Sequence, residues 1–146
     1  MNRIGTKDVP QANSLHRVCN LIALVDQGID NKQELTRQLD IVKRELDYYM
    51  YAAQILGFAH FETPDFSLTQ SGKTYLMGLR PEEKRSMLAN AVRNALVFRE
   101  LLSQAQEEEL SKEKVADFLV ERAGLNRTTA RRRADTMIAW LKYTRD

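Results

Sequence analysis

The sequence has few of the features that mark secreted or membrane-spanning proteins. Its 146 residues include one cysteine, Cys19, so no internal disulfide can form, and its place on an apolar helix face favours a buried thiol. No stretch approaches the roughly 18 uncharged apolar residues that a membrane span requires. Residues 1–10 lack the apolar core of a signal peptide. We therefore expect a globular, cytoplasmic protein that has no membrane partner.

Groups that hold cofactors or perform catalysis are also scarce. His16 and Cys19 share a helical face, but only His60 remains as a further soft ligand, so core packing is favoured over zinc binding. The sequence has no glycine-rich phosphate loop and no serine or cysteine in a recognisable catalytic setting. Pro64-Asp65 and Glu82-Glu83-Lys84 fit a pattern of metal-dependent nucleases, but they fall on a hairpin turn and a helix start. That chemistry needs groups that converge from adjoining strands. We expect no cofactor, no metal and no enzyme activity.

The net charge of +2 decides little, but the charge is unevenly distributed. Residues 1–80 hold nine basic and nine acidic residues, and residues 81–120 hold six and eight. Residues 121–146 hold seven basic and three acidic residues. This C-terminal excess predicts an affinity for phosphates, with a solvated charged surface as the alternative.

Capping residues delimit three helices in the first third of the chain, after a polar arm (1–13) that Val9 can anchor. The expected helices run from Ser14 to about Gln27, from Asn31 to about Gln38, and from Asp40 to Gly57. The tight turn between the second and third helices is typical of a helix-turn-helix.

The third helix has the pattern of a recognition helix. One face is apolar or small and is expected to be buried: Val42, Leu46, Tyr49, Met50, Ala53 and Leu56. The opposite face offers four candidate DNA contacts: Lys43, Arg44, Tyr48 and Tyr51. Asp47, in the middle of that face, argues against this interpretation because its carboxylate repels phosphate.

A small hairpin is expected after Gly57, because two strand-like runs flank the turn residues Thr63-Pro64-Asp65. Thr69 can then cap a short helix that carries Tyr75 back to the core. Three helices followed by a two-stranded hairpin are similar to a winged helix-turn-helix over residues 14–79.

The second half of the sequence also has the pattern of helices. Pro81 suits the first position of a long helix that continues to about Gln106, followed by an acidic link. Ser111 and Asn126 can each cap a helix, with a turn at Gly124, so a second helix-turn-helix is expected. Trp140 and Tyr143 can close its small core. Four residues near the start of its last helix are candidate DNA contacts, and their region is the expected electrostatic anchor: Arg127, Thr129, Arg131 and Arg132.

Five stretches together resemble an uncharacterised bacterial winged-helix module associated with type II restriction endonucleases. The stretches are VPQANSLHRVCNLI, RELDYYMYAAQILGF, FSLTQSGKTYL, VFRELL and TTARRRADTMIAWLKY. The resemblance spans nearly the whole chain. It implies a DNA-recognition part attached to a separate nuclease, and it supplies no contact residues.

The predicted fold class is mainly α, with a winged helix-turn-helix, a two-stranded β-wing, a long helix and a second helix-turn-helix. The expected regions are the arm (1–13), the winged unit (14–79), the long helix with its acidic link (80–110) and the second unit (111–146). The predicted function is duplex DNA binding in restriction or defence, without a catalytic site in the chain. The alternative is a protein-interaction or dimerisation adaptor. Candidate partners are duplex DNA, a nuclease and a second copy, and the chain can be standalone or part of a longer enzyme.

Overall fold

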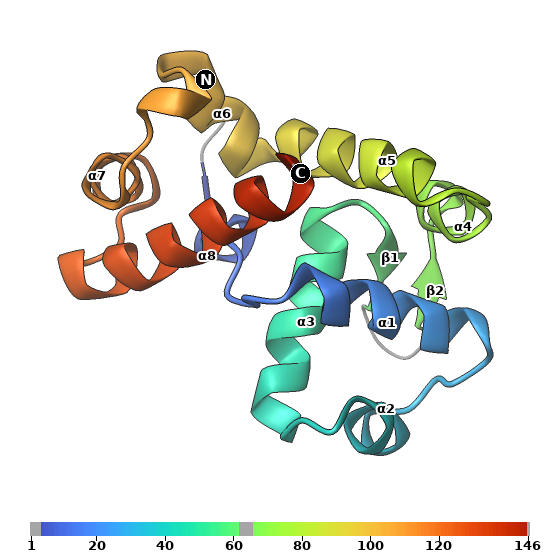
Figure 1. Ribbon diagram of the computed structural model, residues 1–146. Helices are drawn as coiled ribbons and strands as arrows, with labels where there is room; N and C mark the ends of the chain where they lie inside the picture. Colours follow the sequence, from blue (N-terminus) through green and yellow to red (C-terminus); the bar gives the residue numbers. More distant parts are fainter. Residues whose placement is uncertain (1–3, 62–65, 146) are drawn as a thin grey trace.

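The computed structural model describes residues 4–61 and 66–145 (Figure 1). This part of the chain is mainly helical, as predicted, with one small antiparallel sheet. The helices are α1 (Leu15–Asp26), α2 (Lys32–Leu39), α3 (Lys43–Ile55), α4 (Gln70–Leu76), α5 (Pro81–Asn94), α6 (Leu96–Gln104), α7 (Lys112–Ala123) and α8 (Arg127–Arg145). The remaining elements are the 3-10 turns η1 (Thr6–Asp8) and η2 (Glu107–Glu109) and the strands β1 (Ala59–His60) and β2 (Ser67–Leu68).

The first two helices begin where the capping residues predict. The Ser14 side chain accepts a hydrogen bond from the Arg17 amide, and the Asn31 side chain accepts one from the Glu34 amide. Helix α1 then buries one apolar stripe, which consists of Leu15, Val18, Leu21, Ile22 and Val25. This stripe forms the centre of the first unit because α1 packs against both α2 and α3.

The start of α3 differs from the prediction. The helix begins at Lys43, and Asp40 instead ends α2 with a φ of +54°. A short polar side chain tolerates this left-handed conformation, which turns the chain from α2 into α3. Val42 precedes the helix and is 61% exposed, so its predicted burial is wrong. The other predicted core residues of this helix are buried: Leu46, Tyr49, Met50, Ala53 and Leu56.

The predicted hairpin is present as a short antiparallel pair in which Ala59 lies opposite Leu68. The turn predicted at Thr63-Pro64-Asp65 lies outside the described residues. The strands connect α3 to α4, and β1 follows soon after Gly57, whose φ of +75° ends α3 in a left-handed turn.

Helix α4 closes tightly onto the base of the hairpin. The Thr69 hydroxyl donates a hydrogen bond to the Gly57 carbonyl (2.6 Å) and accepts one from the Gly72 amide (3.0 Å), which confirms Thr69 as the cap. Gly72 packs so closely that an added Cβ would lie 2.1 Å from the Phe58 carbonyl oxygen. The Phe58 and Tyr75 rings stack beside it, with centroids 5.2 Å apart.

The predicted long helix is two helices. Pro81 begins α5 as expected, but at Ala95 the backbone becomes extended, with a ψ of 141°, and α6 starts in a new direction. This change of direction lets Phe98 of α6 stack on Trp140 of α8, with ring centroids 5.7 Å apart. Neither proline nor glycine lies near the break, so tertiary packing overrides local helix propensity there.

Helices α7 and α8 follow the predicted second helix pair. The Ser111 side chain accepts a hydrogen bond from the Lys114 amide, and the Asn126 side chain accepts one from the Thr129 amide. Gly124, between the helices, has a φ of +70°. Helix α8 has an apolar stripe that is buried at Ala130, Ala134, Met137 and Leu141 and half-buried at Ile138.

Only one of the two aromatic residues predicted to close the α7–α8 core does so. Trp140 is fully buried, whereas Tyr143 is 50% exposed. The inward positions near the end of α8 are 137, 140, 141 and 144, at helical spacing, and Tyr143 lies between them on the outer side. Thr144 occupies the last buried position in its place.

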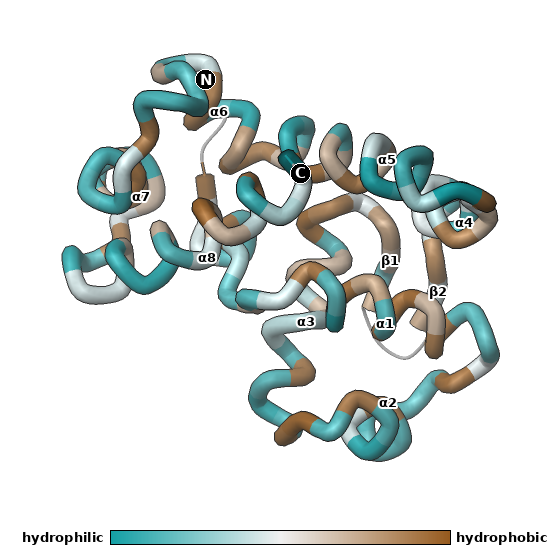
Figure 2. The backbone as a smooth tube through the Cα atoms, in the orientation of Figure 1, coloured by the Kyte–Doolittle hydropathy of each residue, from teal (hydrophilic) through white to brown (hydrophobic). Residues whose placement is uncertain are grey.

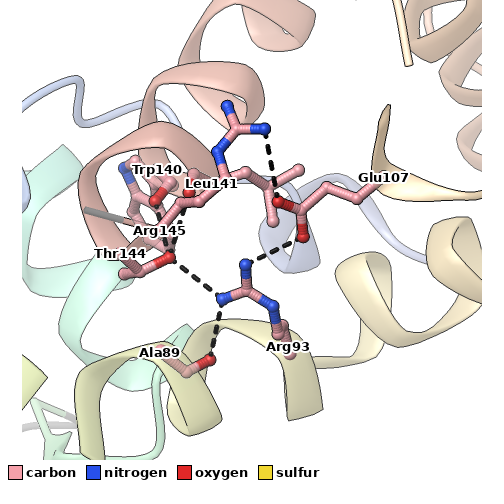
Figure 3. A network of polar contacts seen from close by, with 7 residues as sticks. All are labelled: Ala89, Arg93, Glu107, Trp140, Leu141, Thr144 and Arg145. Atoms are coloured by element: carbon pink, nitrogen blue, oxygen red, sulfur yellow. Dashed lines mark hydrogen bonds and ion pairs between the residues drawn. The ribbon is translucent and has the colours of Figure 1, made fainter. Parts of the chain in front are cut away.

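A polar network holds the last turn of α8 to α5 and η2 (Figure 3). The Arg93 guanidinium donates a hydrogen bond to the Thr144 hydroxyl (3.1 Å) and pairs with the Glu107 carboxylate (2.8 Å). Arg145 lies 3.8 Å from the same carboxylate. Glu107 therefore links two cations from different helices, and the acidic link has a structural role.

The N-terminal arm is ordered by contacts to α8 and runs past that helix to α1 (Figure 1). Val9 is 3% exposed, which confirms it as an anchor. The buried Trp140 indole donates a hydrogen bond to the Ala12 carbonyl (2.8 Å). Two further side-chain pairs flank this bond, Arg133 with Gln11 and Thr136 with Asn13. The buried residues from the arm to α8 consequently form one hydrophobic cluster.

Replacing Gly72 with alanine is expected to destabilise the protein by about 1–3 kcal/mol, because the new methyl group would overlap the Phe58 carbonyl and push α4 from the hairpin. Urea unfolding followed by circular dichroism measures the change. The matched control is Ser71→Ala, at the exposed neighbouring position, which should stay within about 0.5 kcal/mol of wild type. Equal stability of the two variants would contradict the close packing at Gly72.

Candidate nucleic-acid interface

Four of the predicted DNA contacts lie on one surface of α3, which we call the α3 face: Lys43, Arg44, Tyr48 and Tyr51. Lys43 and Arg44 are exposed in the first turn, Tyr48 is half-buried, and Tyr51 is 39% exposed. Arg44, Tyr48 and Tyr51 follow one another at spacings of four and three, so they form one line along the helix. The structure therefore brings the predicted residues of this helix together.

The structure also bears on the objection raised by Asp47. The Lys32 ammonium of α2 lies 3.2 Å from its carboxylate, and both side chains are less than half exposed. Such a pair contributes little stability, about 0–1 kcal/mol. The pair matters more for the surface charge. The Lys32 ammonium cancels most of the negative potential that Asp47 would otherwise exert on a phosphate group nearby.

The basic residues of α8 divide into two groups. Arg127 lies 2.5 Å from the Asp117 carboxylate, and Arg131 lies 3.1 Å from the Glu113 carboxylate, both on α7. These two predicted DNA contacts therefore face α7, and their charges are compensated there. This pairing reduces the positive field that the residue count assigns to the start of α8.

Arg133 lies on the other side of α8, where it reaches the arm. Arg132 is exposed and donates a hydrogen bond to the Thr129 hydroxyl (3.4 Å). Arg133 donates one to the Gln11 side chain (2.7 Å). Burial and the neighbouring Arg132 charge lower the pKa of Arg133, while the proximity of Tyr48 raises it. The coupling to Tyr48 shows that Arg133 lies within electrostatic reach of the α3 face.

The arm adds a further cation to this surface. The Lys7 ammonium lies 5.8 Å from the centre of the Tyr51 ring, within the range of a cation–π contact. Sequence reasoning missed both Lys7 and Arg133 as members of the surface. Lys7 gives no local signal because 44 positions separate it from Tyr51. Arg133 gives none either, because its partner Gln11 lies 122 positions away.

The resulting surface combines cations from three separate segments with two tyrosine rings. The cations are Lys7, Lys43, Arg44 and Arg133. Guanidinium groups bind phosphate oxygens in a two-pronged geometry, and ammonium groups bind them as point charges. A tyrosine offers a ring for stacking and a hydroxyl for hydrogen bonding. Such groups can bind a phosphate backbone.

Only part of the pattern that suggested a nuclease lies in the described residues. Pro64 and Asp65 lie outside the described residues, and Glu82 and Glu83 are exposed in the first turn of α5. The Lys84 ammonium lies over the Tyr75 ring, 5.4 Å from its centre. In residues 4–61 and 66–145, no three His, Cys, Asp or Glu side chains cluster closely enough to hold a metal ion. In the same residues, no helix is both long and apolar enough to cross a membrane.

Cys19 is half-buried, and its sulfur accepts a hydrogen bond from the Tyr75 hydroxyl (3.2 Å). Burial raises the pKa of the Cys19 thiol, although this hydrogen bond and Lys84 oppose the shift. Burial raises the pKa of Tyr75 as well, and the hydrogen bond to Cys19 adds to it. Both groups are therefore neutral at physiological pH, as expected of a packing contact.

The raised thiol pKa predicts slow reaction of Cys19 with a disulfide reagent in the folded protein, since the thiolate is the nucleophile. At pH 8 the native rate is expected to be at least about tenfold below the rate in urea. The chain has one cysteine, so the released thiolate absorbance reports this site alone. Equal rates in the two conditions would show that Cys19 is reactive.

Comparison with known proteins gives a family without an assigned activity. No curated protein and no solved structure matches the chain. Residues 17–145 match a family described as a domain of unknown function, DUF7226. The match begins in α1 and covers every later element, so it includes both helix pairs and the cations of α3 and α8. The chain belongs to the DUF7226 family.

Proposed function

We propose that the protein binds duplex DNA and that α3 is the helix that enters the major groove. The observation that carries this proposal is which charged side chains of the α3 face are paired and which are free. Its two cations, Lys43 and Arg44, are exposed and make no ion pair within the described residues, while the nearby Asp47 is paired with Lys32. Free cations at the start of a helix suit phosphate contacts, and the polar side chains of that helix can reach base edges.

The arrangement of elements supports a winged helix-turn-helix as the binding unit. Helices α2 and α3 are joined by three residues, 40–42, and α1 packs on both helices. The β1–β2 pair follows α3 directly, which is the position of a wing. In helix-turn-helix proteins the second helix of the pair lies in the major groove and the first crosses the backbone. Here those roles fall to α3 and α2.

The second helix pair contributes phosphate contacts in this proposal, and its exposed Arg132 is the main candidate. Arg133 adds charge but also holds the arm, so its substitution would affect both. Arg127 and Arg131 contribute less because Asp117 and Glu113 pair with them. A role in restriction or defence, with cleavage by a separate nuclease, rests on the resemblance of the sequence alone.

The double variant Lys43→Gln and Arg44→Gln is expected to weaken binding to a mixed-sequence duplex. Each lost phosphate contact reduces the slope of log affinity against log salt by about 0.9, so the slope should fall by about two. Fluorescence anisotropy with a labelled duplex, repeated over a series of potassium chloride concentrations, measures both quantities.

The matched control removes the same formal charge from the paired arginines, with Arg127→Gln and Arg131→Gln. This variant should keep a slope close to that of wild type. Equal losses in the two variants would mean that net charge alone drives binding. A wild-type protein whose binding does not depend on salt would overturn the proposal.

The Lys32–Asp47 pair gives a second test. Lys32→Ala should weaken DNA binding, because it exposes the charge of Asp47 on the α3 face. Adding Asp47→Ala to this variant removes that charge and should restore most of the affinity. If the double variant stays as weak as Lys32→Ala, Lys32 binds phosphate itself and does not act by neutralising Asp47.

A further inference from the structure

A pocket lies beside α3 where four segments of the chain meet. Lys7 of the arm, Lys32 of α2 and Phe61, which follows β1, line it together with one side of α3. Its volume is about 410 Å³, within the range of about 300–1,000 Å³ that is common for small-molecule sites. The pocket is therefore large enough for a compact organic ligand.

Helix α3 supplies both apolar and polar parts of this pocket, because hydrophilic and hydrophobic residues alternate along it (Figure 2). Asp47, Met50, Tyr51 and Gln54 line the pocket from α3, and their helical spacing puts them on one side of the helix. Met50 and Phe61 are buried, whereas Tyr51 is 39% exposed. The pocket thus has an apolar floor and an accessible aromatic ring.

Two hydrogen-bond donors of the pocket are available to a ligand. The Gln54 side-chain oxygen accepts a hydrogen bond from the Phe61 amide (2.7 Å), so the Gln54 NH₂ group is left as a donor without a partner in the described residues. The Lys7 ammonium lies 5.8 Å from the centre of the Tyr51 ring and makes no ion pair within the same part of the chain. The pocket therefore offers one neutral and one charged donor beside an aromatic ring.

We propose that this pocket binds a nucleoside phosphate, either as a free mononucleotide or as an unpaired nucleotide of DNA. The base would stack on the Tyr51 ring, since every base has a face that stacks on an aromatic side chain. The phosphate would meet the Lys7 ammonium, which binds phosphate oxygens as a point charge. The Gln54 amide donates hydrogen bonds and the Asp47 carboxylate accepts them, so the two can meet the polar edge of a base.

The lining favours a nucleotide over simpler ligands. An inorganic anion would leave the Tyr51 ring and the apolar floor without contacts. A purely apolar ligand would cover the Lys7 and Gln54 donors without giving them an acceptor, which costs free energy. The pocket shares only Tyr51 with the α3 face, and a free mononucleotide probes it without any duplex. The site therefore does not rest on the proposed duplex binding.

Isothermal titration calorimetry of the full chain with deoxyadenosine 5′-monophosphate tests the proposal. The nucleotide is expected to bind with a dissociation constant below about 1 mM. Deoxyadenosine lacks the phosphate and deoxyribose 5-phosphate lacks the base, so each should bind at least about tenfold more weakly. Absence of nucleotide binding, or equal affinity for the nucleotide and either fragment, would overturn the proposal.

Two variants test whether the nucleotide occupies this pocket. Tyr51→Leu removes the ring and Lys7→Gln removes the charge, and each should weaken nucleotide binding by about tenfold. The matched controls, Tyr143→Leu and Lys142→Gln, change the same residue types at exposed positions of α8 and should bind as wild type does. Unchanged affinity in either pocket variant, or equal losses in the controls, would remove the ligand from this pocket.

A competition experiment separates the two sources of the nucleotide. If the site serves DNA, free nucleotide should displace a labelled duplex that carries one unpaired terminal nucleotide more readily than a fully paired duplex. If the bound nucleotide affects neither duplex, the site serves a free ligand. A protein that binds the nucleotide but no duplex would refute the proposed function alone. One that binds duplex but no nucleotide would refute this site alone.

Discussion

The hydrogen bond from the Trp140 indole to the Ala12 carbonyl joins the two ends of the chain inside the core. Both groups are buried, and leaving either without its partner would cost about 1–3 kcal/mol. The same indole stacks on Phe98, so one side chain fixes the arm, α6 and α8 relative to one another. The position of Arg133 and of Lys7 beside α3 follows from this junction, because the arm carries Lys7 and meets Arg133.

Pairing between helices decides which charges remain available on the surface. Arg127 and Arg131 meet carboxylates of α7, whereas Lys32 of α2 takes up the charge of Asp47. Pairing of Arg127 and Arg131 neutralises two cations in the C-terminal segment, where basic residues are in excess. Pairing of Asp47 neutralises an anion in the first 80 residues, where the charges balance. Together they shift the free positive charge from the start of α8 toward α3, in the opposite sense to the residue count.

The parts of the fold that could be predicted are those that depend on interactions between residues close in the sequence. Caps such as Ser14, Asn31 and Thr69 form bonds three residues away, so their helices begin where the sequence places them. Asp40 and Ala95 could not be predicted in this way. Asp40 serves the end of α2 instead of the start of α3, because the turn needs a left-handed residue. Ala95 breaks a helix of good helix formers, because Phe98 must reach Trp140.

The sequence predicts which candidate residues of α3 lie on one face of the helix. It does not predict which charged residues of other elements pair with them. The spacing of Arg44, Tyr48 and Tyr51 on one helix shows in the sequence that they share a line. The charge partners of Asp47, Arg127 and Arg131 lie 10 to 18 positions away, on the preceding helix of each pair. In each helix pair, side chains of the first helix neutralise charged side chains of the second. In the α2–α3 pair the cation of the first helix neutralises Asp47, and in the α7–α8 pair the carboxylates of the first helix hold Arg127 and Arg131.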